Sequence, residues 1–163
     1  MISWLFQGTI WYNIPQKIIV EEIVLKEAIY ISRNKNEIEI NEVVNLLHKT
    51  EWASGRDAKK IEESVENSTC YAVFDSSKTL IGFARIITDY VTTFYLMDVV
   101  IEESFRGKGI GKMLMEKIME DVGHLYGILH TDGAQAFYER YGFCVTATSE
   151  CGESIMEKVR DNV

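Results

Sequence analysis

The sequence predicts a single α/β (α+β) domain in which helices cover both faces of a mixed β-sheet. The first observation behind this prediction is an apolar run at residues 94–101, where both alternating sets of side chains are hydrophobic except at Asp98. Such a run is typical of a central strand that is buried on both faces. The second observation is that a glycine-rich turn and a stretch with helical periodicity follow this strand directly. Strands that alternate with helices in this way build layered folds.

The segments before the central strand predict one short strand, two helices and a hairpin. Residues 28–33 have strand character, and Asn41 can cap a helix whose apolar residues recur at helical spacing. Asp57 can cap a second helix. Residues 70–75 and 80–88 are rich in β-branched and aromatic side chains and are separated by a polar turn, so we expect a hairpin there.

The segments after the central strand predict a long helix, a further strand, a short helix and a final hairpin. The long helix begins at Gly109 and ends at Gly123, which is a suitable C-cap. Residues 128–131 form the next strand, and residues 133–141 form the short helix. The chain from Phe143 onward returns to strand character. This order of elements gives a mixed sheet with helices on its two faces.

Residues 106–111 read Arg-Gly-Lys-Gly-Ile-Gly and lie between the central strand and the long helix. Glycines let backbone N–H groups approach an anion closely, and the first turn of a helix adds unpaired donors and the positive end of its dipole. The position therefore predicts a pyrophosphate-binding loop. Two common signatures do not fit. A Walker-type loop requires glycine at Arg106 and a hydroxyl at Met113, and the dinucleotide fingerprint requires glycine at Lys112.

The pattern Arg-x-x-Gly-x-Gly at the start of a helix resembles the pyrophosphate loop of the GNAT superfamily of acyl-CoA-dependent N-acyltransferases. Residues 99–111 are similar to the fourth strand, the turn and the loop of that family, and residues 134–143 are similar to its last helix and the turn after it. The resemblance covers residues 80–143 and leaves out the first third of the chain. It implies a mostly antiparallel sheet in which the fourth and fifth strands splay apart.

The resemblance also implies an activity. We expect an N-acetyltransferase that moves the acetyl group of acetyl-CoA, its co-substrate, to a primary amine of a small molecule or peptide by direct attack in a ternary complex. Tyr138 matches the general acid of the family, which protonates the leaving thiolate. Thr131 stands where many members have an asparagine. The residues assigned to the cofactor are Val99, Val100, Ile101, Arg106, Gly107, Lys108, Gly109, Ile110, Gly111, Lys112 and Thr131.

The acceptor amine needs a base, because an alkylammonium with a pKa of about 10.4 costs roughly 4.6 kcal/mol to deprotonate at pH 7. Asp98, Asp89, Glu51 and His130 are candidates for this base, and Asp98 is assigned to the catalytic set together with Tyr138. Two loops are expected to contact the acceptor, through Trp52, Arg56, Asp89 and Tyr90.

Each assignment has a structural alternative. The glycine loop can be a simple turn into a helix, Tyr138 can be an aromatic core residue, and Asp98 can be a hydrogen-bonded structural carboxylate, since a buried acid needs partners whatever its purpose. Trp52 can cover the core instead of an acceptor. A different function class also stays open, namely a non-catalytic acyl-CoA sensor or a partner-docking module. The presence of Tyr138 disfavours it.

Composition sets further expectations. The net charge of −8 argues against nucleic acid as the main partner. The three cysteines form no paired motif, which favours a reducing compartment, and the apolar stretch at residues 1–6 is too short to span a membrane. We therefore expect a cytoplasmic protein with no metal and no membrane partner, and a homodimer is left open. Residues 1–27 are interpreted as an N-terminal extension packed on a single domain of residues 28–163.

Overall fold

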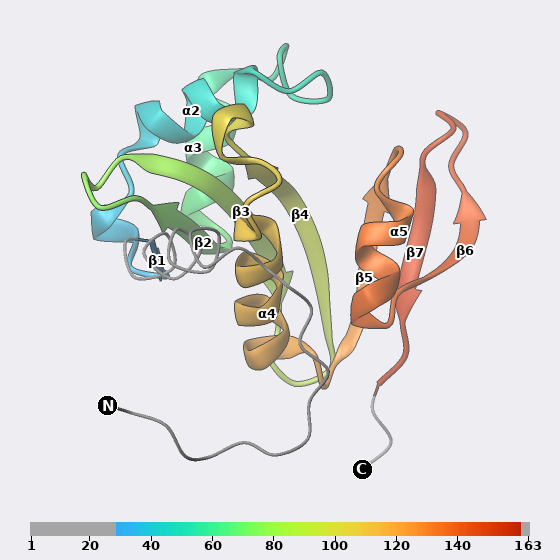
Figure 1. Cartoon of the computed structure of the whole chain (residues 1–163). Helices are drawn as coiled ribbons and strands as arrows, with labels where there is room; N and C mark the ends of the chain where they lie inside the picture. The colour runs from blue at the N-terminus through green and yellow to red at the C-terminus, as the bar shows by residue number, and fades with distance from the viewer. Residues whose placement is uncertain (1–28, 161–163) are drawn as a thin grey trace, which may run out of the picture.

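The computed structural model describes residues 29–160, which form one seven-stranded sheet in the order β1-β2-β3-β4-β5-β7-β6 (Figure 1). Neighbouring strands are antiparallel except β4 and β5, which are parallel. The predicted mixed α/β architecture is therefore confirmed, whereas the predicted extension at residues 1–27 lies outside the described residues. The strands are β1 (Tyr30–Ser32), β2 (Thr69–Phe74), β3 (Leu80–Thr88), β4 (Thr93–Ile101), β5 (Tyr126–Thr131), β6 (Cys144–Thr148) and β7 (Ser154–Lys158).

Helices cover both faces of the sheet, as Figure 1 shows. One face carries α2 (Ile40–His48) and α3 (Ala58–Glu66), and the other carries α4 (Ile110–Val122) and the short α5 (Gln135–Tyr138). The cap expected at Asp57 is confirmed, because its side chain accepts a hydrogen bond from the Lys60 amide at 3.2 Å. The cap expected at Asn41 is wrong. The N-cap is Glu39, two residues earlier, which places Asn41 inside the first turn.

A β-bulge in β4 reverses which side chains face which core. Phe83 is paired with Val100 and Arg85 with Met97, so two residues of β4 lie opposite one residue of β3. Asp98, at the bulge, has a φ of 54°, in the left-handed region that few residues other than glycine adopt. Before the bulge, Leu96 packs in the core under α4, and after it Val100 packs in the core under α2 and α3.

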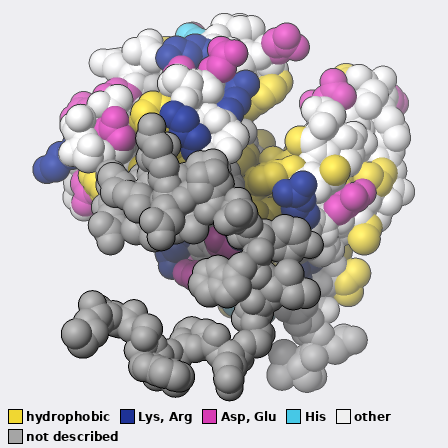
Figure 2. Space-filling view, viewed as in Figure 1, with side chains coloured by type: hydrophobic (Ala, Val, Ile, Leu, Met, Phe, Trp, Pro, Cys, Tyr) yellow, Lys and Arg dark blue, Asp and Glu magenta, His cyan; other side chains and the backbone are white. Residues whose placement is uncertain are grey.

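The parallel pairing of β4 with β5 is short. It runs from Thr93 opposite Tyr126 to Leu96 opposite Leu129 and does not continue to the ends of the strands. Figure 1 shows the two strands meeting at one end and diverging toward the other, and Figure 2 shows a hollow between the two halves of the molecule with hydrophobic side chains at its base. The splayed central strands implied by the sequence are therefore present.

Candidate active site

The strands β4 and β5 diverge beyond their paired residues, and we call the opening between them the splay. The glycine loop joins β4 to α4 next to the open end of the splay. Gly107 and Gly109 have φ angles of 74° and 81°, which side chains disfavour, so the path of the loop depends on glycine. Gly109 is the N-cap of α4 and no side chain caps the helix. The amide of Met113 makes the first intrahelical bond, to the Gly109 carbonyl, which leaves the amides of the preceding turn for an external anion.

The cations of the loop are held in place by the protein itself. The Arg106 Nε donates a hydrogen bond to the carbonyl of Ile101 at 3.0 Å and so fixes the start of the loop against the end of β4. Lys108 lies over the ring of Phe105, with Nζ 5.0 Å from the centroid, and Lys112 is 3.6 Å from Glu116 one turn along α4. The unpaired backbone amides are thus the groups of the loop that could hold an anion, and these exposed side chains add positive charge around them.

The side chains at the end of β4 point alternately to the two faces of the sheet. Val99 and Ile101 pack against the core on the α4 face, whereas the side chain of Val100 is buried in the core on the α2 and α3 face. Because this part of β4 is not paired with β5, its backbone edge is free for an extended ligand such as pantetheine. Val100 can therefore contribute only through its backbone.

Tyr138 ends α5 on the same face as α4. It is 8% exposed, its ring contacts those of Phe137 and Phe143, and burial raises the pKa of its hydroxyl to about 12. Within residues 29–160 its hydroxyl makes no hydrogen bond, yet no fully buried side-chain N or O atom lacks a partner. The hydroxyl must therefore reach the protein surface. A tyrosine in this state stays protonated at neutral pH and can donate to a thiolate.

Thr131 is the last residue of β5 and is 9% exposed. Successive side chains of a strand alternate between faces, so Thr131 shares the α4 face with Leu129, which belongs to the core there. Its hydroxyl is therefore on the same face of the sheet as the glycine loop and Tyr138.

Asp98 lies on the opposite face, in an ionic cluster. Both of its carboxylate oxygens are 2.9 Å from one terminal nitrogen of Arg56, and Oδ2 also accepts a bond from Arg85 Nε at 2.5 Å. Arg85 is buried and donates a second bond to Ser68 Oγ at 3.2 Å. Asp98 is thus held at the bulge by two ion pairs, one of them with a buried arginine. Its assignment to catalysis stays a prediction.

The loop between α2 and α3 brings Trp52 to the same cluster. The guanidinium of Arg56 lies 5.8 Å from the centre of the Trp52 ring, a cation–π geometry, and the Arg56 carbonyl is 2.8 Å from His48 Nε2. Trp52 is half exposed. Three residues that the sequence assigned to catalysis or to the acceptor, Trp52, Arg56 and Asp98, therefore meet on one face beside the splay.

Asp89 and Tyr90 do not join them. They lie in the turn between β3 and β4, at the end where β4 and β5 are paired. Asp89 accepts backbone bonds from Val91, Thr92 and Thr93, and its bonds with Thr92 in particular hold the pKa of its carboxyl well below the usual range. Asp89 thus organises the turn.

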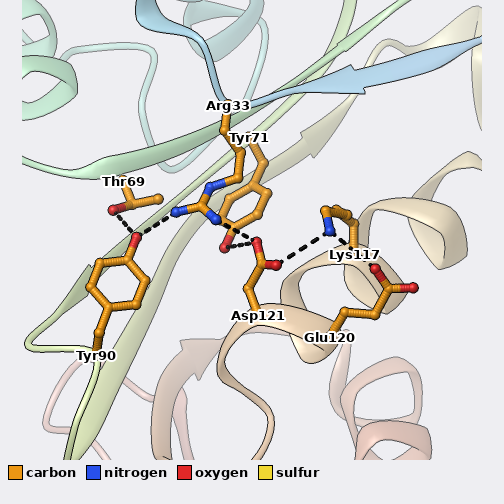
Figure 3. A network of polar contacts seen from close by, with 7 residues as sticks. All are labelled: Arg33, Thr69, Tyr71, Tyr90, Lys117, Glu120 and Asp121. Carbon is orange, nitrogen blue, oxygen red and sulfur yellow. Dashed lines mark hydrogen bonds and ion pairs between the residues drawn. The ribbon is translucent and has the colours of Figure 1, made fainter.

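Tyr90 belongs to the polar network of Figure 3. Its hydroxyl contacts Arg33 at 2.7 Å and Thr69 at 2.5 Å. Arg33 also pairs with Asp121 of α4, to which the buried Tyr71 donates at 3.0 Å; Lys117 bridges Asp121 and Glu120. This network fastens α4 to the sheet, so Tyr90 helps to hold the fold at a distance from the splay.

Comparison with known proteins decides the family. The model of the Acetyltransferase (GNAT) family matches residues 37–143 of this chain. The chain belongs to the GNAT family. An uncharacterised N-acetyltransferase named ycf52 from Porphyra purpurea is 30% identical over 131 residues, which are 76% of this chain and 74% of the relative.

Solved structures agree with this membership. A protein of Xanthomonas campestris pv. campestris assigned to the GNAT family is 30% identical, with a TM-score of 0.68 over 72% of this chain and 85% of its own. An aminoglycoside 6′-N-acetyltransferase in complex with coenzyme A shares the fold, with a TM-score of 0.66 at 22% identity over 79% of this chain and 96% of its own. This GNAT protein is accordingly an acyltransferase, as the sequence predicted.

Sequence reasoning missed Arg85, which lies on β3 and binds Asp98 at the bulge of β4. A signal was present, because Arg85 is the only cation in the apolar strand at residues 80–88 and Asp98 the only anion in the next one. A buried charge needs a partner of opposite sign, and an antiparallel hairpin brings neighbouring strands together. The pairing could thus have been expected, but the contribution of Arg56 could not.

Two further observations concern the expected partners. Within residues 29–160 no helix is long and apolar enough to cross a membrane. In the same part of the chain, no group of three or more His, Cys, Asp and Glu side chains is arranged to hold a metal ion. The cytoplasmic location stays a prediction, and so does the homodimer.

Proposed function

We propose that this GNAT protein transfers the acetyl group of acetyl-CoA to a primary amine of a small molecule or peptide, in a ternary complex. One observation carries the proposal: the uncapped N-terminus of α4, with its glycine loop, adjoins a splay whose α4 face also holds Tyr138 and Thr131. Acetyl transfer from acetyl-CoA would need an anion-binding turn, an open strand edge and a proton donor on one face of the sheet, and these residues could supply them.

Different residues would bind different parts of acetyl-CoA. The amides at the start of α4, with Arg106, Lys108 and Lys112 around them, would hold a pyrophosphate. The edge of β4 at Val99 and Ile101 would pair with the amide groups of pantetheine, and a main-chain N–H there would stabilise the oxyanion of the attacked thioester. Thr131 would offer a hydroxyl to the same ligand from β5.

Tyr138 would supply the proton to the leaving sulfur. A thiol has a pKa of about 8.5, so proton transfer from a tyrosine at about 12 is uphill by roughly 3.5 units unless the tyrosine regains a proton at once. After a neutral amine attacks the thioester, its nitrogen is positively charged and must lose one proton to become an amide. Proton flow from that nitrogen through Tyr138 to sulfur would avoid a free phenolate, so Tyr138 acts as a relay as much as an acid.

The test combines binding and turnover. Calorimetric titration with acetyl-CoA and with free CoA should give saturable binding, and a thiol-release screen should identify an acceptor among polyamines, amino acids, aminoglycosides and peptides with free amino termini. Binding without thiol release from any amine would instead support the sensor alternative. Absence of binding would overturn the interpretation of the glycine loop.

Tyr138→Phe separates catalysis from binding. We expect the CoA dissociation constant to stay within about twofold, and turnover to fall about 100-fold, the usual contribution of a positioned acid. Tyr30→Phe is the matched control, because Tyr30 stacks on Phe74 in the edge strand β1, away from the splay. Equal turnover of Tyr138→Phe and the unmodified protein would remove Tyr138 from the mechanism.

A further inference from the structure

A second group of titratable side chains lies near the splay, on the face of the sheet opposite to Tyr138. Tyr95 on β4 is opposite Ile128 on β5, and Leu96 is opposite Leu129, so each pair shares one face. Leu96 and Leu129 belong to the α4-side core, which puts Tyr95, Ile128 and then His130 on the other face. His130 and Tyr138 are therefore on opposite faces of the sheet at the open end of the splay.

His130 has two neighbours there. The ring of Tyr95 lies 5.7 Å from the imidazole ring, between centroids, and so limits the orientations of the imidazole. Glu153, just before β7, has Oε2 3.7 Å from His130 Nδ1. This separation is too long for a hydrogen bond but suits an ion pair once the ring is protonated. The His130 side chain is 35% exposed, so the imidazole ring is partly open to solvent.

The charged groups on this face are close enough to influence one another. The pKa of the Tyr95 hydroxyl is raised by burial and then by the charge of Glu153, while Arg85 lowers it and Asp98 raises it. Glu157, opposite Ile128 on β7, is a further acid on this face. Asp98 is neutralised by Arg56 and Arg85. His130 is thus a basic side chain on this face with a carboxylate, Glu153, beside its ring.

We propose that His130 is the general base for the acceptor amine, and that Glu153 is a positioning residue that holds the protonated ring. This inference rests on the proposed acetyl transfer. The acceptor ammonium gives one proton to the imidazole of His130 and becomes a neutral amine. That amine forms the C–N bond as the C–S bond of the thioester breaks, and its second proton passes through Tyr138 to the departing sulfur. Base and acid thus act from opposite faces of the sheet through the splay.

The first experiment compares His130→Gln with the unmodified protein, using the polyamine, aminoglycoside or peptide that gives the fastest thiol release. Glutamine keeps a polar side chain but cannot take up a proton near neutral pH. We expect kcat/KM at pH 7 to fall about 100-fold and the CoA dissociation constant to stay unchanged. The defect should shrink as the pH approaches 10, where the amine loses its proton to solvent.

His124→Gln is the matched control, because His124 is exposed in the turn between α4 and β5. Turnover of His130→Gln equal to the unmodified protein at every pH would overturn the role of His130 and leave the acetyl transfer intact. Absence of thiol release by the unmodified protein with all the amines would overturn the proposed function itself, and this inference with it.

The second experiment tests Glu153 with the same acceptor. Glu153→Gln removes the carboxylate beside His130 and should lower kcat, while the KM for the acceptor and the CoA dissociation constant stay unchanged. Glu150→Gln, an exposed residue in the same turn, should change none of the three. An unchanged kcat in Glu153→Gln would overturn the positioning role, since a purely structural glutamate would alter stability alone.

Discussion

The two ends of β4 differ in what holds them. At residues 93–96 the strand is paired on both sides, and the turn before it is fastened by Asp89 and by the Tyr90 network. At residues 97–101 the strand is paired with β3 alone, a bulge reverses the side-chain faces, and buried ion pairs add to the hydrogen bonds with β3. One strand thus lies inside the paired sheet at one end and borders the opening between β4 and β5 at the other.

The difference shows why the charges lie where they do. Asp98 has a left-handed backbone conformation at the bulge, where β4 is paired with β3 alone, and such a conformation persists only when surrounding contacts hold it. The arginines from β3 and from the loop between α2 and α3 supply those contacts on the face of the sheet that carries α2 and α3. The opposite face, which carries α4, is left for the proposed cofactor. Substitutions at the two ends should therefore have different consequences for stability and for binding.

Asp98→Ala should have the largest effect. It leaves buried Arg85 without its main partner, and removal of one member of a buried ion pair typically costs about 3–5 kcal/mol. Denaturant unfolding followed by circular dichroism would measure the loss. Glu102→Ala, which breaks the more exposed pair with Lys49, should cost no more than about 1 kcal/mol. Similar losses in the two variants would show that the bulge does not depend on its charges.

Gly111→Ala should separate binding from stability at the site end. Its Cβ would lie 3.6 Å from the Phe137 ring, an ordinary contact, and Gly111 is inside α4, so alanine should raise helix stability by up to about 1 kcal/mol. The same Cβ would crowd the first turn, and we expect CoA affinity to fall about tenfold. Gly109→Ala is the comparison, because its φ of 81° should make alanine destabilising. Unchanged CoA affinity in Gly111→Ala would contradict anion binding at this turn.

Asp89→Ala should lower stability and leave CoA affinity unchanged. The folded-state pKa of Asp89 is depressed by its bonds with Thr92, so its contribution is present above the unfolded pKa, near 3.9, and is lost as the pH falls below that value. Unfolding at pH 7 and pH 3 should therefore show a larger gap between variant and unmodified protein at pH 7. A loss of CoA affinity would instead link this turn to the splay.

Tyr90→Phe should have the smallest effect. It removes the hydroxyl that contacts Arg33 and Thr69 on an exposed surface, which should cost less than about 1 kcal/mol. Thiol release and CoA affinity should stay at the level of the unmodified protein. A clear rise in KM for the acceptor would show that Tyr90 contacts it after all.

Local patterns predicted most of the elements. The cap at Asp57 was found because its side chain acts on an amide three residues away. The cap at Asn41 was misplaced because several polar residues precede α2 and only packing chooses among them. The turn at the glycine loop was predicted because glycine spacing is itself a local pattern, and Gly107 and Gly109 do adopt positive φ angles. Asp89 and Tyr90 were assigned to the acceptor because they are close in sequence to β4, but they adjoin its paired end.

The sequence by itself determined the strand, the glycine loop, the helix and the tyrosine that together indicate the GNAT family, because each is a contiguous pattern. Only the tertiary structure decided which charges meet. Arg56, Arg85 and Asp98 come from three separate segments, and the register of β3 with β4 brings two of them together. The splay likewise depends on where pairing between β4 and β5 stops, and that point places His130 and Tyr138 on opposite faces.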